Sequence, residues 1–458
     1  MPEDTIAAIA TATLKAGIGI IRVSGPEAIQ IAESLMFTKY GKKLDILSQP
    51  SHTVKYGFIF DGKEPVDEVL LTVFRKPRSY TAEDTVEISC HGGIFVLRRI
   101  LSLVLRHGAR LAEPGEFTKR AFMNGRIDLS EAEAVMDIIS AGNEFARRNS
   151  LSILRGDLYE KINVLRDKIL HESAFIESAL DDPEHYSLDG YGDKLKSIIS
   201  GIIEELDKMI ERSKSGRILK NGIKTVIAGK PNVGKSSILN LLSGEERAIV
   251  TDIPGTTRDV LTSEILLKGV PLILFDTAGI RDTGDSIEKI GVEKSRKYME
   301  EADLVLFTLD SSAPMDEGDR EIYESIHKSG KKCIILLNKS DLEGECEDLS
   351  CFSNPVIEFS AVNGTGLDEL SEVIEKLFET GVFDPSEDLY VTNERQTEEL
   401  RYTKTSLEMV IKSIEDGMTE DFFTADLMDA YSHLGKIIGE DTDEDLFDRI
   451  FSEFCMGK

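Results

Sequence analysis

Hydrophobic residues are spaced differently in successive parts of the chain, and each spacing predicts a different kind of segment. Within residues 1–120, short apolar runs that end in glycine or polar residues predict strands. These runs are 18–25, 54–60, 68–74 and 85–90. Helical spacing follows in Pro26 to Leu35 and in Ile94 to His107. The mixture predicts an N-terminal α+β domain over residues 1–120.

Residues 121–217 and 381–458 carry helical spacing. One long amphipathic helix is expected over 144–180, and Asp181-Asp182-Pro183 should end it. We interpret 121–217 and 381–458 as the two parts of one helical domain, interrupted by an inserted domain, because insertions succeed at exposed loops.

Residues 218–380 alternate short apolar runs with helical segments. The runs are 224–228, 272–276, 304–310, 333–338 and 356–360. Such alternation is typical of a doubly wound, mostly parallel sheet. The predicted fold class is therefore an α/β domain inserted in an α-helical domain, preceded by an α+β domain.

The segment Gly229-Lys230-Pro231-Asn232-Val233-Gly234-Lys235-Ser236 matches the phosphate-binding pattern G-x-x-x-x-G-K-S. It follows a predicted strand and opens a predicted helix, so backbone N–H groups and the helix dipole can converge on phosphate oxygens. Lys235 is expected at the β- and γ-phosphates, and Ser236 on magnesium.

Two further segments fit the magnesium and γ-phosphate side of such a site. Asp276-Thr277-Ala278-Gly279 ends a predicted strand 41 positions after Lys235. Its aspartate should hold magnesium through water, and the Gly279 N–H can reach the γ-phosphate. Thr257, in Gly255-Thr256-Thr257-Arg258-Asp259, is expected to complete the magnesium shell as part of a first switch.

Two segments at later strand ends fit guanine. In Asn338-Lys339-Ser340-Asp341 the aspartate can accept hydrogen bonds from N1–H and the 2-amino group of guanine, donors that adenine lacks. A backbone N–H of Ser360-Ala361 can meet the guanine oxygen. Each motif alone also occurs as a turn, but together and in this order they predict a GTPase.

The residue that activates water is less evident. Ras-type enzymes have glutamine after the D-x-x-G motif, where this chain has Ile280, which can neither orient nor deprotonate water. Glu288 is one candidate base, although a surface glutamate is the commoner interpretation. Arg258 or Arg281 could act as an arginine finger, although surface pairing is commoner for them too.

Composition excludes some classes of protein. The 458 residues include five scattered cysteines, carry no apolar run long enough for a membrane span, and begin without a basic secretory segment. We therefore expect a cytoplasmic protein. The net charge of −29 would repel a phosphate backbone, so any RNA contact should be made largely by a partner. A role of this acidity in solubility alone stays open.

Two segments allow alternative interpretations. Residues 114–126 are expected to form a loop between domains rather than a ligand site. The terminal Cys455-Met456-Gly457-Lys458 is expected to fray, unless the amphipathic segment 446–454 docks and fixes it.

The chain resembles the MnmE (TrmE) family of tRNA-uridine modification GTPases over essentially its whole length. The resemblance rests on Asp4-Thr5-Ile6, 19–25, Tyr80-Thr81-Ala82-Glu83-Asp84, His91-Gly92-Gly93, 114–126, 128–134, the GTPase motifs and the terminal Cys-x-Gly-Lys. It implies a homodimer that works with a flavin-dependent subunit of the MnmG type. Together they would modify C5 of the wobble uridine of certain tRNAs, using a one-carbon unit of tetrahydrofolate.

The resemblance also implies residue roles. In the N-terminal domain, Arg22, Glu87, Arg126 and Lys458 would contact 5-formyl-tetrahydrofolate, with Cys455 near the pterin as a possible reactive thiol. Potassium would promote dimerisation of the GTPase domains and supply the charge of an arginine finger. Its ligands would be Asn232 with oxygens around Thr251, Ile253 and Thr256, and Glu288 would orient the attacking water.

The expected nucleotide site therefore comprises a long set of residues. They are Asn232, Val233, Gly234, Lys235, Ser236, Ser237, Thr251, Thr256, Thr257, Asp276, Thr277, Ala278, Gly279, Asn338, Lys339, Asp341, Ser360 and Ala361. The main alternative is an Era/Der-type ribosome-assembly GTPase. It should carry a basic RNA-binding module, whereas residues 381–458 hold 7 basic and 20 acidic side chains. A folate-binding regulatory GTPase is a second alternative.

Overall fold

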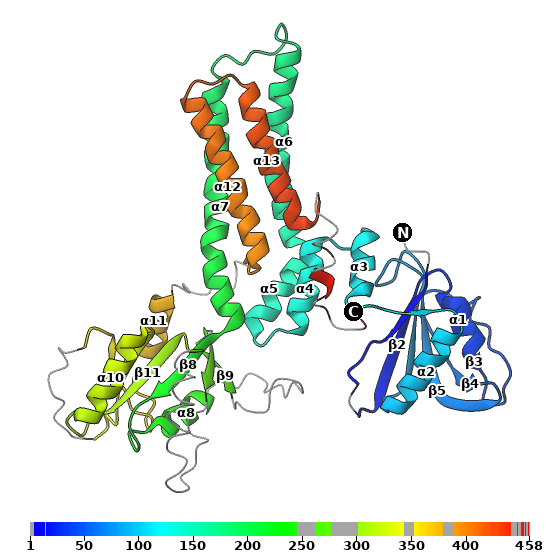
Figure 1. The fold of residues 1–458 in the computed structure, drawn as a ribbon, viewed down its shortest axis with the longest axis horizontal. Helices are drawn as coiled ribbons and strands as arrows, with labels where there is room; N and C mark the ends of the chain where they lie inside the picture. The colour runs from blue at the N-terminus through cyan, green and yellow to red at the C-terminus, as the bar shows by residue number, and fades with distance from the viewer. Residues whose placement is uncertain are drawn as a thin grey trace. The chain divides into compact units, whose positions relative to one another are not determined.

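A computed structural model describes most of the chain in two compact units (Figure 1). It describes residues 4–13, 15–244, 262–268, 270–275, 301–342, 352–378, 389–440, 447, 450–452, 454 and 457. The first unit comprises Met1–Met136, Ile153–Tyr186 and Phe423–Lys458, and the second comprises Asp137–Ser152 and Ser187–Phe422. Within these described ranges, no helix is both long and apolar enough to cross a membrane.

The first unit contains a seven-stranded sheet with the strand order β3-β4-β5-β6-β2-β1-β7. The strands are β1 (Ile6–Ile9), β2 (Ile18–Ser24), β3 (Met36–Phe37), β4 (Thr53–Asp61), β5 (Glu64–Phe74), β6 (Thr85–His91) and β7 (Arg110–Leu111). All neighbouring strands are antiparallel except β1 and β7. The sequence pattern found the longer strands and missed β1, β3 and β7, which are too short to show a period.

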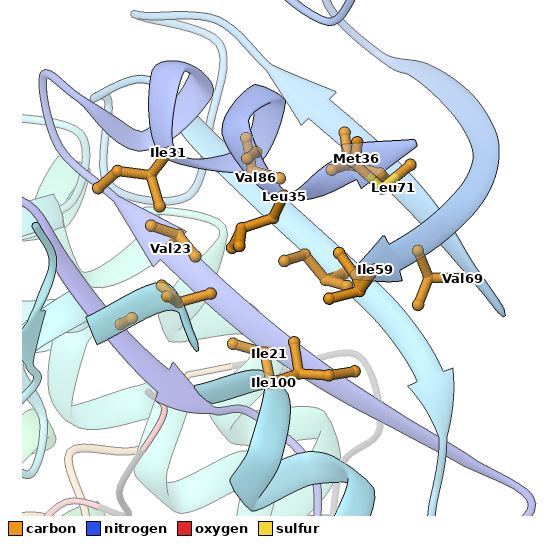
Figure 2. Close-up of a cluster of buried hydrophobic side chains, with 14 of the residues drawn as sticks. Ile21, Val23, Ile31, Leu35, Met36, Ile59, Val69, Leu71, Val86 and Ile100 are labelled. Atoms are coloured by element: carbon orange, nitrogen blue, oxygen red, sulfur yellow. The ribbon is translucent and has the colours of Figure 1, made fainter. Parts of the chain in front are cut away.

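Alternation along these strands places the core on one face of the sheet. Helices α1 (Ala28–Leu35) and α2 (Ile94–Arg106) cover that face. Figure 2 shows Ile31 and Leu35 of α1 and Ile100 of α2 packed with strand residues that include Ile21 and Val23. Between those two strand residues Arg22 points to the other face, because successive side chains of a strand alternate. The predicted α+β domain is confirmed.

The C-terminal segment of the chain packs within this same unit. Helices α3 (Glu116–Met123) and α4 (Leu129–Ile139) hold an apolar cluster with Phe447, Phe451 and Phe454. The rings of Phe122 and Phe447 lie 4.9 Å apart between centroids. Further along, Gly457 packs so closely on Ile9 that a Cβ would overlap the Ile9 carbonyl oxygen.

These contacts correct two expectations. The tail at Gly457 is docked rather than frayed, because the preceding phenylalanines bury their rings. The segment 114–126 contains helix α3 rather than only a loop. Gly115 precedes the helix with φ +69°, and Phe117 and Ala121 are buried on one helical face.

The long helix expected over 144–180 is two helices, α5 (Glu144–Leu154) and α6 (Asp157–Asp181). Gly156 separates them because it adopts the left-handed region, with φ +92°, at the N-cap of α6. In the first unit α6 packs on α13 (Asp421–Ile438) through Arg166, whose guanidinium lies 4.1 Å from the ring centroid of Tyr431 and pairs with Glu440.

The second unit pairs helices α7 (Tyr191–Asn221) and α12 (Glu394–Glu415) side by side (Figure 1). Three ion pairs link them: Lys196 with Glu415, Lys404 with Asp207, and Arg217 with Glu394. Residue numbers rise on one helix as they fall on the other, so the helices are antiparallel. The chain therefore leaves this helical pair at the end of α7 and returns to it at the start of α12, as predicted for an inserted domain.

That inserted segment forms a six-stranded sheet with the order β13-β12-β11-β8-β10-β9. Its described elements are β8 (Ile223–Ala228), α8 (Lys235–Gly244), β9 (Thr262–Leu267), β10 (Val270–Phe275), β11 (Leu304–Asp310), α10 (Glu317–Ser329), β12 (Lys332–Asn338), β13 (Val356–Glu358) and α11 (Leu367–Phe378). Only the β9–β10 pair is antiparallel. Helices α8 and α11 pack on one face and α10 on the other, which confirms the doubly wound, mostly parallel sheet.

Two asparagines next to and within α5 hold the chain where it enters and leaves the inserted domain. Asn143 donates to the carbonyl oxygens of Leu219 (3.0 Å) and Lys220 (3.2 Å), at the end of α7. Asn149 exchanges two hydrogen bonds with the backbone of Tyr390: it donates to the carbonyl at 2.9 Å and accepts from the N–H at 2.8 Å. Both Asn149 and Tyr390 are buried. The two asparagine side chains thus provide hydrogen-bond partners for backbone groups that have none within a helix or sheet.

Replacing Asn149 by alanine should destabilise the second unit. The change strands one buried N–H and one buried carbonyl of Tyr390, at a cost of about 1–3 kcal/mol each. Urea unfolding followed by circular dichroism should show the lower midpoint. The exposed Asn240 on α8 provides the matched control, Asn240→Ala. Equal midpoints for the two variants would show that the Asn149 bonds contribute nothing.

Candidate functional site

The phosphate loop lies where the sequence placed it, between the end of β8 and the start of α8. Gly229 and Gly234 have φ of +144° and +99°, conformations that glycine adopts readily. The Lys235 ammonium donates to the carbonyl oxygens of Gly229 (2.8 Å) and Lys230 (2.6 Å). Burial lowers the pKa of Lys235, so an anion beside it would favour the charged form. The loop thus curls around one half-buried cation.

The side-chain amide of Asn338 joins this loop to the other strand ends. Its Nδ2 donates to the carbonyl oxygen of Val233 at 2.8 Å, and its Oδ1 accepts from the backbone N–H of Ala361 at 3.0 Å. Asn338 is 2% exposed. A Cβ at Gly234 would overlap the Nδ2 of Asn338, so the loop can approach this amide only because position 234 is glycine.

Two more bonds order the segment after β12. Lys339, at φ +68°, pairs its ammonium with Asp310 at 2.5 Å. Burial opposes ionisation of Asp310, but Lys339 and Ser312 outweigh it, so the pKa of this carboxyl lies below its ordinary value. The Ser360 hydroxyl donates to Asp341 Oδ1 at 2.6 Å, which fixes the direction of that carboxylate. The phosphate loop, the Asn338-to-Asp341 segment and Ser360-Ala361 therefore meet at one edge of the sheet, together with Asp310 at the end of β11.

A cavity of about 670 Å³ adjoins this edge on the α10 side. Its lining includes Asn232 and Val233 of the phosphate loop and Lys339, but not Asp341, Ser360 or Ala361. These last three residues, which are expected to bind guanine, therefore do not line this cavity. Asn232 itself is exposed, with φ +66°.

Eleven expected site residues lie outside the described part of the chain. They are Thr251, Ile253, Thr256, Thr257, Asp276, Thr277, Ala278, Gly279, Glu288, Cys455 and Lys458. The expectations for the two switches, the water-activating residue, most potassium ligands and the reactive thiol stay predictions.

A second cluster forms around Arg22 on the open face of the N-terminal sheet. Arg22 and Glu87 are directly opposite on β2 and β6, and their side chains pair at 2.8 Å. The Arg22 guanidinium lies 5.1 Å from the ring centroid of Tyr80 and 5.6 Å from that of Phe117. It also donates to the carbonyl oxygen of Gly457 at 3.2 Å. The cluster therefore joins the second strand of the chain to its C-terminal end.

Arg126 reaches the same cluster through Tyr80. Its guanidinium lies 5.0 Å from the Tyr80 ring centroid and donates to the Tyr80 carbonyl at 3.0 Å. The Tyr80 hydroxyl hydrogen-bonds Thr118 at 2.8 Å, which holds the ring beside both arginines. The structure thus brings together Arg22, Glu87 and Arg126, three of the four residues expected there.

Sequence reasoning missed several members of both clusters. Asp310 carried a signal, since an acidic residue ends a strand at the edge where the motifs gather. Tyr80 lies in a segment that supported the family resemblance, but its ring was assigned no role. Phe117 and the Gly457 carbonyl had no local signal, because their contacts join segments far apart in the chain.

Comparison with known proteins covers both clusters. The family model described as "MnmE helical domain" matches residues 129–455, and that described as "GTP-binding protein TrmE N-terminus" matches residues 5–126. Together they span nearly the whole chain, including both parts of the helical domain.

Curated relatives carry the description "tRNA modification GTPase MnmE". The protein of Lachnoclostridium phytofermentans is 52% identical over 461 residues, covering 100% of both chains. That of Thermoanaerobacter pseudethanolicus is 48% identical over 465 residues, again covering 100% of both. That of Clostridioides difficile is 45% identical, covering 100% of this chain and 99% of its own. Among solved structures, the G domain of the T. maritima FeoB iron transporter covers 34% of this chain at 29% identity, with a TM-score of only 0.26.

Replacing Gly234 by alanine should weaken GTP binding by roughly a hundredfold. The new Cβ would displace Asn338 and demands a left-handed backbone, which costs about 1–3 kcal/mol before any clash. Gly201→Ala is the matched control, because Gly201 lies within α7 with open space around it. That change should leave GTP affinity unaltered and stabilise α7 by about 0.5–1 kcal/mol. Fluorescent-nucleotide titration measures both, and wild-type affinity of the Gly234 variant would contradict the geometry.

Proposed function

This chain belongs to the MnmE (TrmE) family of tRNA modification GTPases, and on that premise we propose how it acts. Hydrolysis of GTP is the family's activity. Our proposal is that a homodimer works with a flavin-dependent subunit, and that together they modify C5 of the wobble uridine of certain tRNAs. A tetrahydrofolate would supply the one-carbon unit, and the partner would make most of the tRNA contact.

The described residues support a division of labour at the nucleotide. Lys235 would place its ammonium beside the β- and γ-phosphates and donate the one proton that Gly229 and Lys230 leave free, and Ser236 would ligate magnesium. Asp341, oriented by Ser360, would accept from guanine. The role of Asn338 is to hold these groups in register before the nucleotide arrives, which avoids a reorganisation cost on binding.

The proposed potassium dependence rests on Asn232. Its exposed side chain, on a residue held at φ +66°, belongs to a loop whose next carbonyl is fixed by Asn338. An amide oxygen is a suitable ligand for a hard cation. Bound there, potassium would supply positive charge near the transferred phosphoryl group, where Ras-type enzymes receive an arginine.

The N-terminal cluster fits a tetrahydrofolate by its chemistry. A carboxylate such as Glu87 can accept from the amino and ring N–H groups of a pterin, and guanidinium groups can pair with the glutamate tail of folate. The Tyr80 ring provides a flat surface beside both arginines. The hydrogen bond from Arg22 to the Gly457 carbonyl carries the proposal. It connects the cluster of Arg22, Glu87 and Arg126 to the terminal segment that contains Cys455.

An Era/Der-type role is less well supported. Such a GTPase needs a basic RNA-binding module, and the C-terminal segment instead holds 20 acidic residues and matches a helical-domain family model. For a purely regulatory folate-binding GTPase, the modified wobble uridine should be present both in the wild-type strain and in the deletion strain. Liquid chromatography and mass spectrometry of tRNA nucleosides from a deletion strain distinguish these roles, because only the proposed one removes the modified wobble uridine.

Turnover of GTP should be faster in KCl than in NaCl of equal ionic strength, by about tenfold or more if the ion supplies what an arginine finger supplies elsewhere. Asn232→Ala should remove most of that potassium-specific gain. Equal rates in the two salts for the wild-type protein would end the potassium proposal and leave the GTPase activity intact.

Arg22→Ala should weaken binding of 5-formyl-tetrahydrofolate by about tenfold or more, because a charge-assisted pair contributes about 1.5–3 kcal/mol. Isothermal titration calorimetry measures the loss. Arg99→Ala is the matched control. Arg99 lies in the same domain but on helix α2, where it is more exposed than Arg22 and pairs with Asp61. Comparable losses in both variants would refute the assignment of the site.

A further inference from the structure

Lys230, the second residue of the phosphate loop, directs its side chain to helix α10. Its Nζ lies 2.6 Å from Asp316 Oδ2 and 2.8 Å from Asp319 Oδ2. None of the expectations drawn from the motif gave this lysine a role, because the pattern G-x-x-x-x-G-K-S leaves its position unspecified.

The two aspartates are rigidly held before they meet the lysine. Asp316 is the N-cap of α10, and its side chain accepts from the Asp319 N–H while Asp319 accepts from the Asp316 N–H, each at 3.2 Å. This reciprocal capping box fixes both carboxylates at the helix start. The Asp319 side chain is only 6% exposed. The Lys230 stem passes beside Gly318, where a Cβ would make an ordinary van der Waals contact with its Cδ at 3.5 Å.

The main chain of Lys230 faces the nucleotide site. Its carbonyl oxygen accepts from the Lys235 ammonium at 2.6 Å, and Gly229 supplies the second acceptor. The direction of the Lys235 ammonium therefore depends on the orientation of the peptide that Lys230 contributes.

The start of α10 is also tied to the guanine side of the site. The connection from β11 to α10 begins at Asp310, which pairs with Lys339 at 2.5 Å. Next to it, the N–H of Ser311 donates to the Asn338 carbonyl at 2.8 Å. A short segment thus contacts the guanine-binding motif at one end and the phosphate loop at the other.

We propose that Lys230, Asp316 and Asp319 form a clamp that positions Lys235 for GTP hydrolysis. The three are positioning residues, since they act through the peptide that orients Lys235. The clamp holds the loop in its phosphate-binding shape when no phosphate is there to organise it. This inference rests on the GTPase activity alone and is independent of the folate and potassium proposals.

An ordinary surface ion pair would not have this effect. Exposed pairs contribute about 0–1 kcal/mol, because water screens them and both side chains lose freedom. The pair of Lys328 with Glu324, on the same helix, is of that kind, with side chains 78% and 68% exposed. In the clamp one carboxylate is almost fully buried, and a single ammonium meets two acceptors.

The test compares kcat and KM for GTP in Lys230→Met, Asp319→Asn and the double variant, with Lys328→Met as the matched control. Each clamp variant should lower kcat/KM by about tenfold, since misplacing a catalytic group by a fraction of an ångström is enough. The double variant should be no worse than either single variant, because the two residues act as one unit. The conservative variant Lys230→Arg should keep most of the wild-type kcat/KM, and Lys328→Met should keep all of it.

Two results would overturn the clamp. One is a change below twofold in Lys230→Met, or a change equal to that of Lys328→Met. The other is additivity of the two single effects, which would mean that the residues act separately. Thermal melting of each variant identifies loss of α10 structure, and Lys230→Met leaves the capping box intact. Measuring in both KCl and NaCl separates this test from the potassium proposal, because the clamp predicts the same fold loss in either salt.

Discussion

The buried amide of Asn338 is the interaction on which the nucleotide site depends. A single planar group accepts from Ala361 and donates to Val233, so three loops that follow different strands are held at fixed separations. Because an amide buried without partners costs about 1–3 kcal/mol, the arrangement is stable only when both loops are in place. The requirement for glycine at position 234 follows directly, since no larger residue lets the phosphate loop reach Asn338.

The same logic of side chains satisfying distant backbone groups operates where the GTPase domain joins its helices. Asn143 holds the end of α7, immediately before β8, and Asn149 holds the backbone of Tyr390, immediately before α12. β8 runs without interruption into the phosphate loop. The strand β8 therefore joins the end of α7, which Asn143 holds, directly to the phosphate loop.

In the N-terminal unit, two arginine side chains are held close together. Arg22 and Arg126 both lie against one tyrosine ring, and Glu87 neutralises the first of them. The Tyr80 ring attracts each guanidinium through a cation–π contact, which offsets part of the repulsion between the two neighbouring cations. The C-terminal segment joins this cluster because its phenylalanines bury themselves between α3 and α4, and the carbonyl of Gly457 then falls within reach of Arg22.

The sequence by itself determined the class of fold, the GTPase motifs and the longer elements, because each depends on residues that are close along the chain. The period of apolar residues found the strands around Arg22 and the helices of the doubly wound sheet, and the spacing of Lys235 and Asn338 identified their motifs. Only the tertiary structure decided which residues meet. The helix at 116–123 and the docking of Gly457 depend on buried partners elsewhere in the chain. Asn338 reaches Val233 across 105 residues and Arg22 reaches Gly457 across 435, and contacts at such separations leave no periodic trace in the amino-acid sequence because packing selects them.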